Sequence, residues 1–306
     1  DEDDIEEEEI LLGRAGVLSS ARIVGLNQDE GKAVGDDAGW CVGNNDVEDI
    51  VFGIGKVDLT GSAGGVASIG PARVLLVLDL NGLLVERVAK VKDKDIKARV
   101  GKPGGPLNAG KYWAFLRPGH KQFVQFLFDK FDVLAWSSAQ MKNIEALLNV
   151  LLNNEQLSNL VGIFDQESCT KACQDPKNPY KPLFLKPLCK VYKAYPKYSA
   201  LNTLLVDDSL YKSVENEEFT SIHPKEWTRD MKNDKALLPG GSIREYLEKL
   251  ACSASTATFR GVPSFVKAHP FDCGYSAKEL DEQKQLAETA RKGVQELEAR
   301  RLKGDG

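Results

Sequence analysis

The chain has 306 residues, of which 42% are hydrophobic and 28% are charged, and its formal net charge at pH 7 is -5. This length and composition predict a soluble globular protein with room for one large or two modest domains. The first ten residues hold eight of the 45 acidic side chains, so the rest of the chain has only a small positive excess, which gives no indication of direct nucleic-acid binding.

Membrane and targeting segments are not expected. No stretch approaches the roughly 18 consecutive apolar residues that a membrane-spanning helix needs, and the acidic start opposes both a secretory signal and a mitochondrial presequence. The six cysteines are scattered along the chain, so a reducing compartment is favoured over a disulfide framework. A zinc site is not expected, because only Cys169 and Cys173 are close together and no second Cys or His pair follows at zinc-finger spacing.

Residues 1–70 are acidic and then rich in Gly, Ser and Asn, with only short apolar runs. This composition predicts a flexible leader. From Arg73 the pattern changes, and we expect the main domain over residues 71–275.

Four apolar runs of strand length occur in the main domain, at 74–78, 133–136, 160–164 and 204–206. Continuous runs of this kind are typical of parallel strands that are buried on both faces.

Helical patterns lie between these runs. One begins at Pro118 and continues through Phe123 and Leu127. Another has apolar residues three or four apart, at Met141, Ile144, Leu148 and Leu151. Strands that alternate with helices predict an α/β fold with a doubly wound parallel sheet.

The last segment, 276–306, is charged and rich in helix formers, which predicts a C-terminal helix. Leu280, Ala287 and Val294 recur seven residues apart, as in a helix that binds a partner or forms a coiled coil. A solvated helix is the alternative, and Gly293 favours it because glycine weakens a helix.

Polar side chains follow three of the four apolar runs directly. Asp79 and Asn81 follow the first run, Ser137 the second, and Asp207 and Asp208 the fourth. Ligands of a doubly wound sheet bind beyond the carboxyl ends of the strands, so we expect these side chains to share one site. A carboxylate nucleophile, further carboxylates for Mg²⁺ and a hydroxyl for phosphate oxygens suit phosphoryl transfer through an aspartyl-phosphate.

The same segments resemble a known family. VLLVLDLNGLL at 74–84, FDVLAWSSA at 131–139 and LLVDDS at 204–209 resemble the first, second and fourth motifs of the haloacid dehalogenase superfamily. LRPGHKQFVQFLF at 116–128 is similar to a segment of the phosphatases that act on the RNA polymerase II C-terminal domain, also called NLI-interacting-factor-like phosphatases. The resemblance covers residues 71–273 and implies a Rossmann-like haloacid-dehalogenase fold with a small inserted β-hairpin and no large cap domain.

The resemblance also implies roles for individual residues. Asp79 would be the nucleophile, Ser137 the phosphate-binding hydroxyl, and Asp207 with Asp208 the acids that support Mg²⁺. Asn81 would lend its main-chain carbonyl to the metal. Because three acids crowd negative charge at one edge, we expect Asp207→Asn to weaken metal binding and to stabilise the metal-free protein.

The family also has a lysine in its third motif. Lys186 in FLKPL matches it best. Lys190 is the rival, because the separation between Lys186 and Asp207 is longer than is usual in the family.

Asn81 departs from the family pattern. The second acid of the first motif protonates the leaving group and then activates water, and an amide has no titratable proton near pH 7 for this purpose. General acid–base catalysis contributes roughly 10²–10⁴-fold, so we expect slower turnover with phosphate binding retained.

Two other segments have patterns that bear on the site. Residues 105–111 match the core of a nucleotide-binding loop, but Tyr112 replaces the Ser or Thr that Mg²⁺ requires there. The turn of the inserted β-hairpin is the better interpretation. Asp165 to Leu185, with three prolines, is expected to be a long loop that precedes a helix carrying Lys186.

The sequence therefore predicts a Mg²⁺-dependent phosphoprotein phosphatase that acts on phosphoserine or phosphothreonine, with weakened turnover. A catalytically inactive binding module with the same fold is the alternative. We expect a phosphoprotein or phosphopeptide substrate, no nucleic acid or membrane, a protein partner on the C-terminal helix, and a nuclear or cytoplasmic location, the nucleus by analogy.

Overall fold

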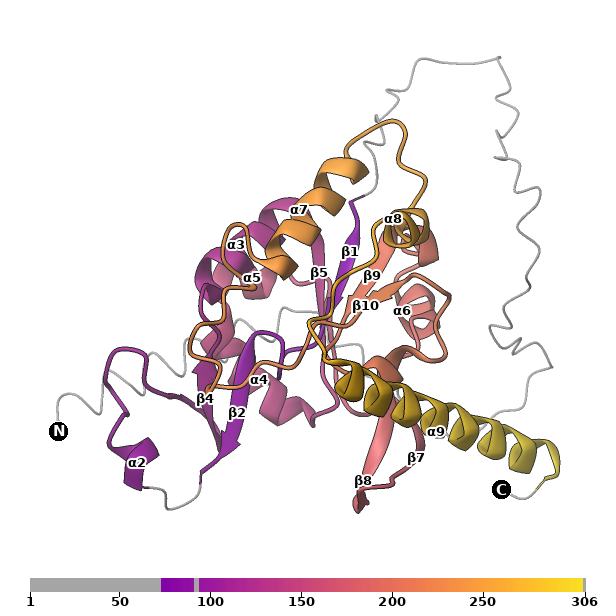
Figure 1. Cartoon of the computed structure of the whole chain (residues 1–306), viewed down its shortest axis with the longest axis horizontal. Coiled ribbons are helices and arrows are strands. Elements are labelled where there is room, and N and C mark those ends of the chain that lie inside the picture. Colours follow the sequence, from indigo (N-terminus) through magenta and orange to yellow (C-terminus); the bar gives the residue numbers. More distant parts are fainter. Residues whose placement is uncertain (1–72, 91–93, 305–306) are drawn as a thin grey trace.

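The computed structural model describes residues 73–90 and 94–304 (Figure 1). The predicted leader, 1–70, lies outside these residues. Within the described ranges, none of the helices is both long enough and apolar enough to cross a membrane.

A five-stranded sheet lies at the centre of the molecule, with the strand order β10-β9-β1-β5-β6. Its strands are β1 (Leu75–Leu78), β5 (Asp132–Trp136), β6 (Gly162–Phe164), β9 (Thr203–Val206) and β10 (Ser221–Ile222). Every neighbouring pair is parallel. The predicted parallel sheet is confirmed, and all four apolar runs contribute a strand to it.

Both faces of the sheet are covered, because the side chains of each strand alternate between two cores. In β1, Leu76 and Leu78 belong to one core and Leu75 and Val77 to the other. Five helices of the described residues supply side chains to the first core: α3 (His120–Lys130), α4 (Met141–Leu151), α5 (Asn154–Ser158), α7 (Ser242–Ala254) and α8 (Val262–Ala268). Helix α6 (Cys189–Ala194) covers the second. Burial on both faces explains why the strands are continuous apolar runs.

The first two helices form where the sequence predicts them. Helix α3 begins two residues after Pro118 and buries Phe123 and Leu127. Helix α4 buries Ile144 and Leu148 at the predicted spacing of four. The short 3-10 helix η1 (Ala200–Asn202) directly precedes β9.

The inserted β-hairpin after β1 is larger than predicted. It is a three-stranded antiparallel sheet of order β2-β4-β3, built from β2 (Val85–Ala89), β3 (Leu107–Ala109) and β4 (Tyr112–Leu116). Helix α2 (Lys94–Lys97) lies between β2 and β3. Gly110 has a φ of 61° in the turn from β3 to β4, which a glycine adopts without strain. The segment that resembles a nucleotide-binding loop therefore includes this hairpin turn.

The prediction of a long loop from Asp165 to Leu185 is wrong. Most of it forms a second hairpin, β7 (Thr170–Asp175) with β8 (Asn178–Leu185), and Pro176 lies in its turn. Proline favours loops because it has no N–H to donate. A two-stranded ribbon tolerates proline because each strand has one edge without a partner, and the ladder here has register shifts as well.

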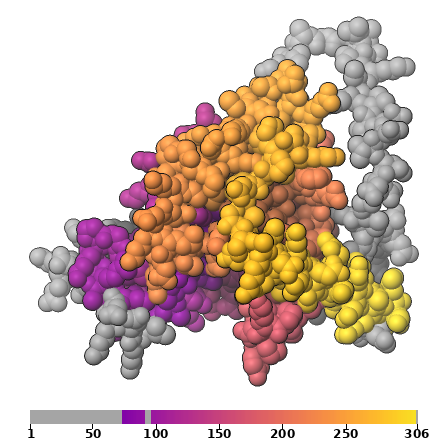
Figure 2. Space-filling model, viewed as in Figure 1, coloured from indigo at the N-terminus to yellow at the C-terminus, as the bar shows by residue number. Residues whose placement is uncertain are grey.

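The C-terminal helix α9 (Ala277–Leu302) lies along the surface of the molecule, drawn in yellow in Figure 2. Ala287, Ala290 and Val294 are buried in a core that includes residues of β7, β8 and the 3-10 helix η2 (Leu210–Ser213). A methyl group on Gly293 would come within 2.7 Å of Cys173 Cβ. The glycine therefore allows close packing, and the protein's own body covers the apolar stripe that suggested a coiled coil.

Candidate active site

The predicted acids meet at the carboxyl edge of the central sheet. Asp79 follows β1, and Asp207 and Asp208 follow the neighbouring strand β9, where Leu78 pairs with Val206. The backbone N–H of Asp79 donates to the Val206 carbonyl at 3.0 Å. All three acids are buried, and one carboxylate oxygen from each lies within 4.8 Å of the others.

Lys186 joins two of these acids. Its ammonium is fully buried and donates to Asp79 Oδ1 at 2.9 Å, to Asp207 Oδ2 at 2.6 Å and to the carbonyl of Trp136 at 2.6 Å. Asn216 holds the local backbone, because its amide donates to the Lys186 carbonyl at 3.1 Å. The ammonium is thus fixed beside the carboxylate expected to act as nucleophile.

Lys190, the rival candidate, lies elsewhere. It is on α6, and its ammonium donates to the carbonyls of Ser168 and Cys169 at 3.0 and 3.3 Å. Burial lowers its pKa from the ordinary value. The structure therefore brings Lys186 to Asp79, although Lys186 directly follows β8 and does not lie on the helix expected there.

Lys212 is a second cation in the site, which sequence reasoning missed. It lies in η2, and its ammonium is 3.2 Å from Asp79 Oδ2, 2.9 Å from Asp207 Oδ1 and 3.6 Å from Asp208 Oδ1. The side chain is 7% exposed. A lysine four residues after Asp208 can fold back over the acids in one helical turn, and that spacing was the available signal.

Burial and charge shift the pKa values of these groups in different directions. Burial alone would raise the pKa of Asp207, but the ammonium groups of Lys186 and Lys212 hold it well below its usual range. Burial raises the pKa of Asp208 well above the ordinary value, and the charges of Asp207 and Asp79 add to this although Lys212 opposes it. Burial would lower the pKa of Lys212, yet the three carboxylates raise it well above normal.

The donor set suits a hard divalent cation. Asp79, Asp207 and Asp208 can each offer one carboxylate oxygen, and Mg²⁺ prefers oxygen ligands. The ammonium of Lys212 lies among the same three carboxylates. The three carboxylates therefore offer ligands of the kind that a divalent metal prefers, and the ammonium of Lys212 already lies among them.

Ser137 lies at the same edge, directly after β5, and is buried. Its backbone N–H donates to the Phe164 carbonyl at 3.0 Å, and its Oγ accepts from the N–H of Ala139 at 3.3 Å. Because Leu78 pairs with Ala135, the strand that carries Ser137 adjoins the strand that carries Asp79.

Asn81 lies in the turn that leaves the sheet. Its amide oxygen accepts the backbone N–H of Arg87 at 2.9 Å, at the start of the inserted sheet. Gly82 follows with a φ of 82°, and a methyl group there would lie 2.6 Å from Asp208 Oδ2. The glycine lets the turn approach the acids, while the Asn81 side chain helps to shape the turn.

Glu226 is an additional acid near the site that the sequence did not indicate. Its Cγ would lie 3.0 Å from a methyl group on Gly82, and its charge raises the pKa of Asp208. The N–H of Trp227 donates to the Gly82 carbonyl at 2.8 Å and fixes this approach. Glu226 is distant in sequence from the motifs, which explains why the sequence did not indicate it.

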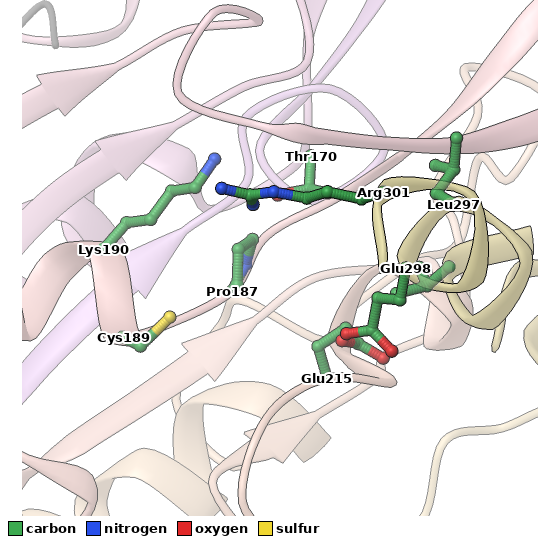
Figure 3. Close-up of a pocket in the computed structure, with 9 residues that line it drawn as sticks. Thr170, Pro187, Cys189, Lys190, Glu215, Leu297, Glu298 and Arg301 are labelled. Atoms are coloured by element: carbon green, nitrogen blue, oxygen red, sulfur yellow. The ribbon is translucent and has the colours of Figure 1, made fainter. Parts of the chain in front are cut away.

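A separate cavity of about 310 Å³ lies between α6 and α9 (Figure 3). Lys190 and Arg301 extend from opposite sides of it, and the carboxylates of Glu215 and Glu298 lie together. Burial raises the pKa of Glu215, and the charge of Glu298 adds to this. The residues that line this cavity do not include the acids at the sheet edge, so it is distinct from the candidate active site.

An aspartate after the first strand, a lysine against it and an acid pair after the neighbouring strand are the groups that a phosphoryl-transfer site of the haloacid dehalogenase type would need. The family model for NLI interacting factor-like phosphatase matches residues 74–259. This match covers more than half of the 306 residues, and the chain belongs to that family.

Two individual proteins are similar to the chain over parts of their length. An uncharacterised FCP1 homology domain-containing protein of Schizosaccharomyces pombe is 30% identical over 89 residues, which are 29% of this chain and 32% of that protein. The structure of Fcp1, an essential RNA polymerase II CTD phosphatase, aligns with a TM-score of 0.37 and 13% identity over 76% of this chain and 66% of that one. The chain thus spans about a third of the curated relative.

Proposed function

We propose that the protein is a Mg²⁺-dependent phosphatase of phosphoserine and phosphothreonine in proteins, which acts through an aspartyl-phosphate on Asp79. The observation that carries the proposal is the buried contact of Lys186 with both Asp79 and Asp207, at 2.9 and 2.6 Å, at the carboxyl edge of the sheet. Membership of a phosphatase family supports it.

The proposed reaction has two displacements at phosphorus. A carboxylate oxygen of Asp79 forms a bond to phosphorus, the bond from phosphorus to the seryl or threonyl oxygen breaks, and the leaving oxygen takes up a proton from solvent water. A water oxygen then forms a bond to phosphorus and the bond from phosphorus to the Asp79 oxygen breaks. Inorganic phosphate leaves, one proton of the water passes to solvent, and the Asp79 carboxylate is restored. Lys186 orients Asp79 and offsets negative charge, and the hydroxyl of Ser137 donates to a phosphate oxygen. Bound Mg²⁺, held by Asp79, Asp207, Asp208 and the main-chain carbonyl of Asn81, would neutralise charge on the transferred group.

Asn81 makes the proposed enzyme slow. Its amide cannot give a proton to the leaving oxygen or take one from water, and its oxygen accepts the N–H of Arg87. Loss of general acid–base catalysis costs roughly 10²–10⁴-fold. The leaving group of an aryl phosphate needs no general acid, so with that substrate the loss falls on hydrolysis of the aspartyl-phosphate, and we expect this intermediate to accumulate.

A peptide is the proposed substrate class, because a small three-stranded sheet with one short helix stands where a large cap would enclose a metabolite. We assign the catalytic domain to residues 71–275 and propose a nuclear or cytoplasmic location, the nucleus by analogy with its family.

The C-terminal helix is proposed to bind a protein partner with its C-terminal end. Leu297 and Leu302 are 44% and 88% exposed on this helix. Replacement of both by serine should abolish partner binding and leave phosphatase turnover intact, which a pull-down with matched turnover assays would measure.

The test of the proposed function is phosphate release from a phosphopeptide and from a small aryl phosphate, with Mg²⁺ and with chelator. Wild type should be slow, Asn81→Asp should be faster, and Asp79→Asn should be inactive. The turnover of wild type should fall further below that of Asn81→Asp with the phosphopeptide than with the aryl phosphate, because an alkoxide is the poorer leaving group. Failure of both wild type and Asn81→Asp to release phosphate would refute the enzyme proposal.

A binding module that keeps the fold is the second candidate. Asn81 in place of an acid favours it, as does Lys212 among the carboxylates. Beryllium fluoride, which imitates a phosphoryl group on an aspartate, separates the two. With Mg²⁺ it should raise the melting temperature of wild type and leave Asp79→Asn unchanged if the site is competent, and it should shift neither protein if the site only recognises a partner.

A further inference from the structure

Hydrogen bonds hold the backbone of Lys212 where its ammonium contacts Asp79, Asp207 and Asp208. The backbone N–H of Lys212 donates to the Ser209 carbonyl at 3.1 Å, and its carbonyl accepts from the N–H of Lys186 at 2.8 Å. These bonds fix the backbone of Lys212 between the acid pair and the end of β8. The side chain is buried, so its ammonium interacts with carboxylates in place of water.

The charges of the cluster balance almost completely without a metal. Asp79, Asp207 and Asp208 carry three negative charges when ionised, and Lys186 and Lys212 carry two positive ones. Lys186 contacts two of the acids, whereas Lys212 lies within 3.6 Å of all three, the same set that can hold a metal. Lys212 therefore lies where a divalent cation would be repelled by it.

We propose that the ammonium of Lys212 and a divalent cation compete for the carboxylates of Asp79, Asp207 and Asp208, so that Lys212 is the counterion of the metal-free protein and weakens its metal affinity. This inference rests on the proposed function only in taking the acid cluster as a divalent-metal site. Metal binding requires the Lys212 side chain to leave the cluster, and the energy of its ion pairs is subtracted from the binding energy.

The direct test is binding of Mn²⁺ to the whole chain, measured from the loss of the electron paramagnetic resonance signal of free Mn²⁺. Lys212→Met removes the charge and keeps an unbranched side chain, and it should lower the dissociation constant at least about tenfold relative to wild type. Lys190→Met is the matched control, because it removes one half-buried lysine charge outside the cluster. It should bind as wild type does. An unchanged Mn²⁺ affinity in Lys212→Met would overturn the proposal.

A second measurement uses wild type and does not depend on how the variant folds. Buried, hydrogen-bonded ammonium groups exchange their protons slowly, so Lys186 and Lys212 should each give a lysine side-chain nitrogen signal in nuclear magnetic resonance. The signal that is missing from the spectrum of Lys212→Arg belongs to Lys212. Saturating Mg²⁺ should remove the Lys212 signal and keep that of Lys186, and survival of both at saturation would contradict displacement.

The outcomes separate this inference from the proposed function. Tighter Mn²⁺ binding by Lys212→Met without any phosphate release supports the competition and counts against the phosphatase. Phosphate release by wild type with equal Mn²⁺ affinity in both proteins supports the phosphatase and overturns the competition.

Discussion

Neutralising Asp207 and neutralising Asp208 should move the stability of the metal-free protein in opposite directions. Asp207 is fully buried, accepts from Lys186 at 2.6 Å and forms an ion pair with Lys212 at 2.9 Å, so Asp207→Asn leaves two buried ammonium groups with one fewer carboxylate. Breaking a buried ion pair costs about 3–5 kcal/mol. Because Asp79 still contacts both lysines, we expect the lower end, about 3 kcal/mol, and a melting temperature lower by about 6–12 °C.

Asp208 differs from Asp207 because its buried carboxylate is paired only weakly. Its contact with Lys212 is long, at 3.6 Å, and burial together with the charges of Asp207 and Asp79 raises its pKa. An amide of nearly the same shape removes that unfavourable charge. Asp208→Asn should therefore stabilise the metal-free protein by about 1 kcal/mol, or about 2–4 °C.

The pH dependence follows from the signs of the two shifts. The folded-state pKa of Asp207 is depressed, so its stabilisation is present above the ordinary aspartate pKa and is lost as the pH falls through the folded value. The folded-state pKa of Asp208 is raised. The contribution of Asp208 to the free energy of unfolding is therefore fully favourable below the ordinary aspartate pKa and is lost as the pH rises through the folded-state pKa. The advantage of Asp208→Asn should be larger at about pH 8 than at about pH 5, whereas the deficit of Asp207→Asn should persist at both.

Thermal melts of wild type and the two variants in chelator, at both pH values, measure these shifts. The reasoning is refuted if both variants move in the same direction, or if the gap between Asp208→Asn and wild type fails to narrow at the lower pH. The sequence alone suggested that Asp207→Asn would be stabilising, because it showed the acids but not that Lys186 and Lys212 both form ion pairs with Asp207.

Three further substitutions test other parts of the structure. Arg117→Met should cost about 3–5 kcal/mol in urea unfolding, because Arg117 and Asp234 form a buried two-point ion pair with both distances at 2.8 Å; a loss below about 1 kcal/mol would contradict this. Gly293→Val should detach α9, because even a methyl group there comes within 2.7 Å of Cys173 Cβ; hydrogen exchange in α9 should rise, and unchanged protection would count against the packing. Lys186→Met should abolish phosphate release, and wild-type turnover in this variant would remove the lysine from the mechanism.

The parallel sheet could be predicted because its strands are buried on both faces. Leu75 and Leu76 face different cores, so both positions require apolar residues and the run is unbroken. The same burial pattern places the next residue, Asp79, at the edge of the sheet. By contrast, β8 carries prolines and is exposed over its first half, so its sequence looks like that of a loop.

The acids of the site could be predicted, but their cations could not be assigned completely. Asp79 and Asp207 follow adjacent strands, so sheet topology alone brings them together. The side chain of Lys186 reaches them from the end of a hairpin that the sequence did not reveal, and Lys212 does so from a short 3-10 helix. Glu226 lies close to Gly82 because the N–H of Trp227, the next residue, donates to the Gly82 carbonyl. No periodic pattern in the sequence encodes such a contact.

The most direct test of the central claim is chemical capture of the aspartyl-phosphate. Wild type would be mixed with a small aryl phosphate and Mg²⁺, quenched in acid and reduced with borohydride, which converts a phosphorylated aspartate to homoserine. Position 79 would then be read by peptide mass spectrometry. We predict homoserine at position 79 of wild type, with a higher yield than in Asn81→Asp, since the latter should hydrolyse the intermediate faster. Phosphate release without homoserine at position 79, or homoserine at another aspartate, would contradict the account.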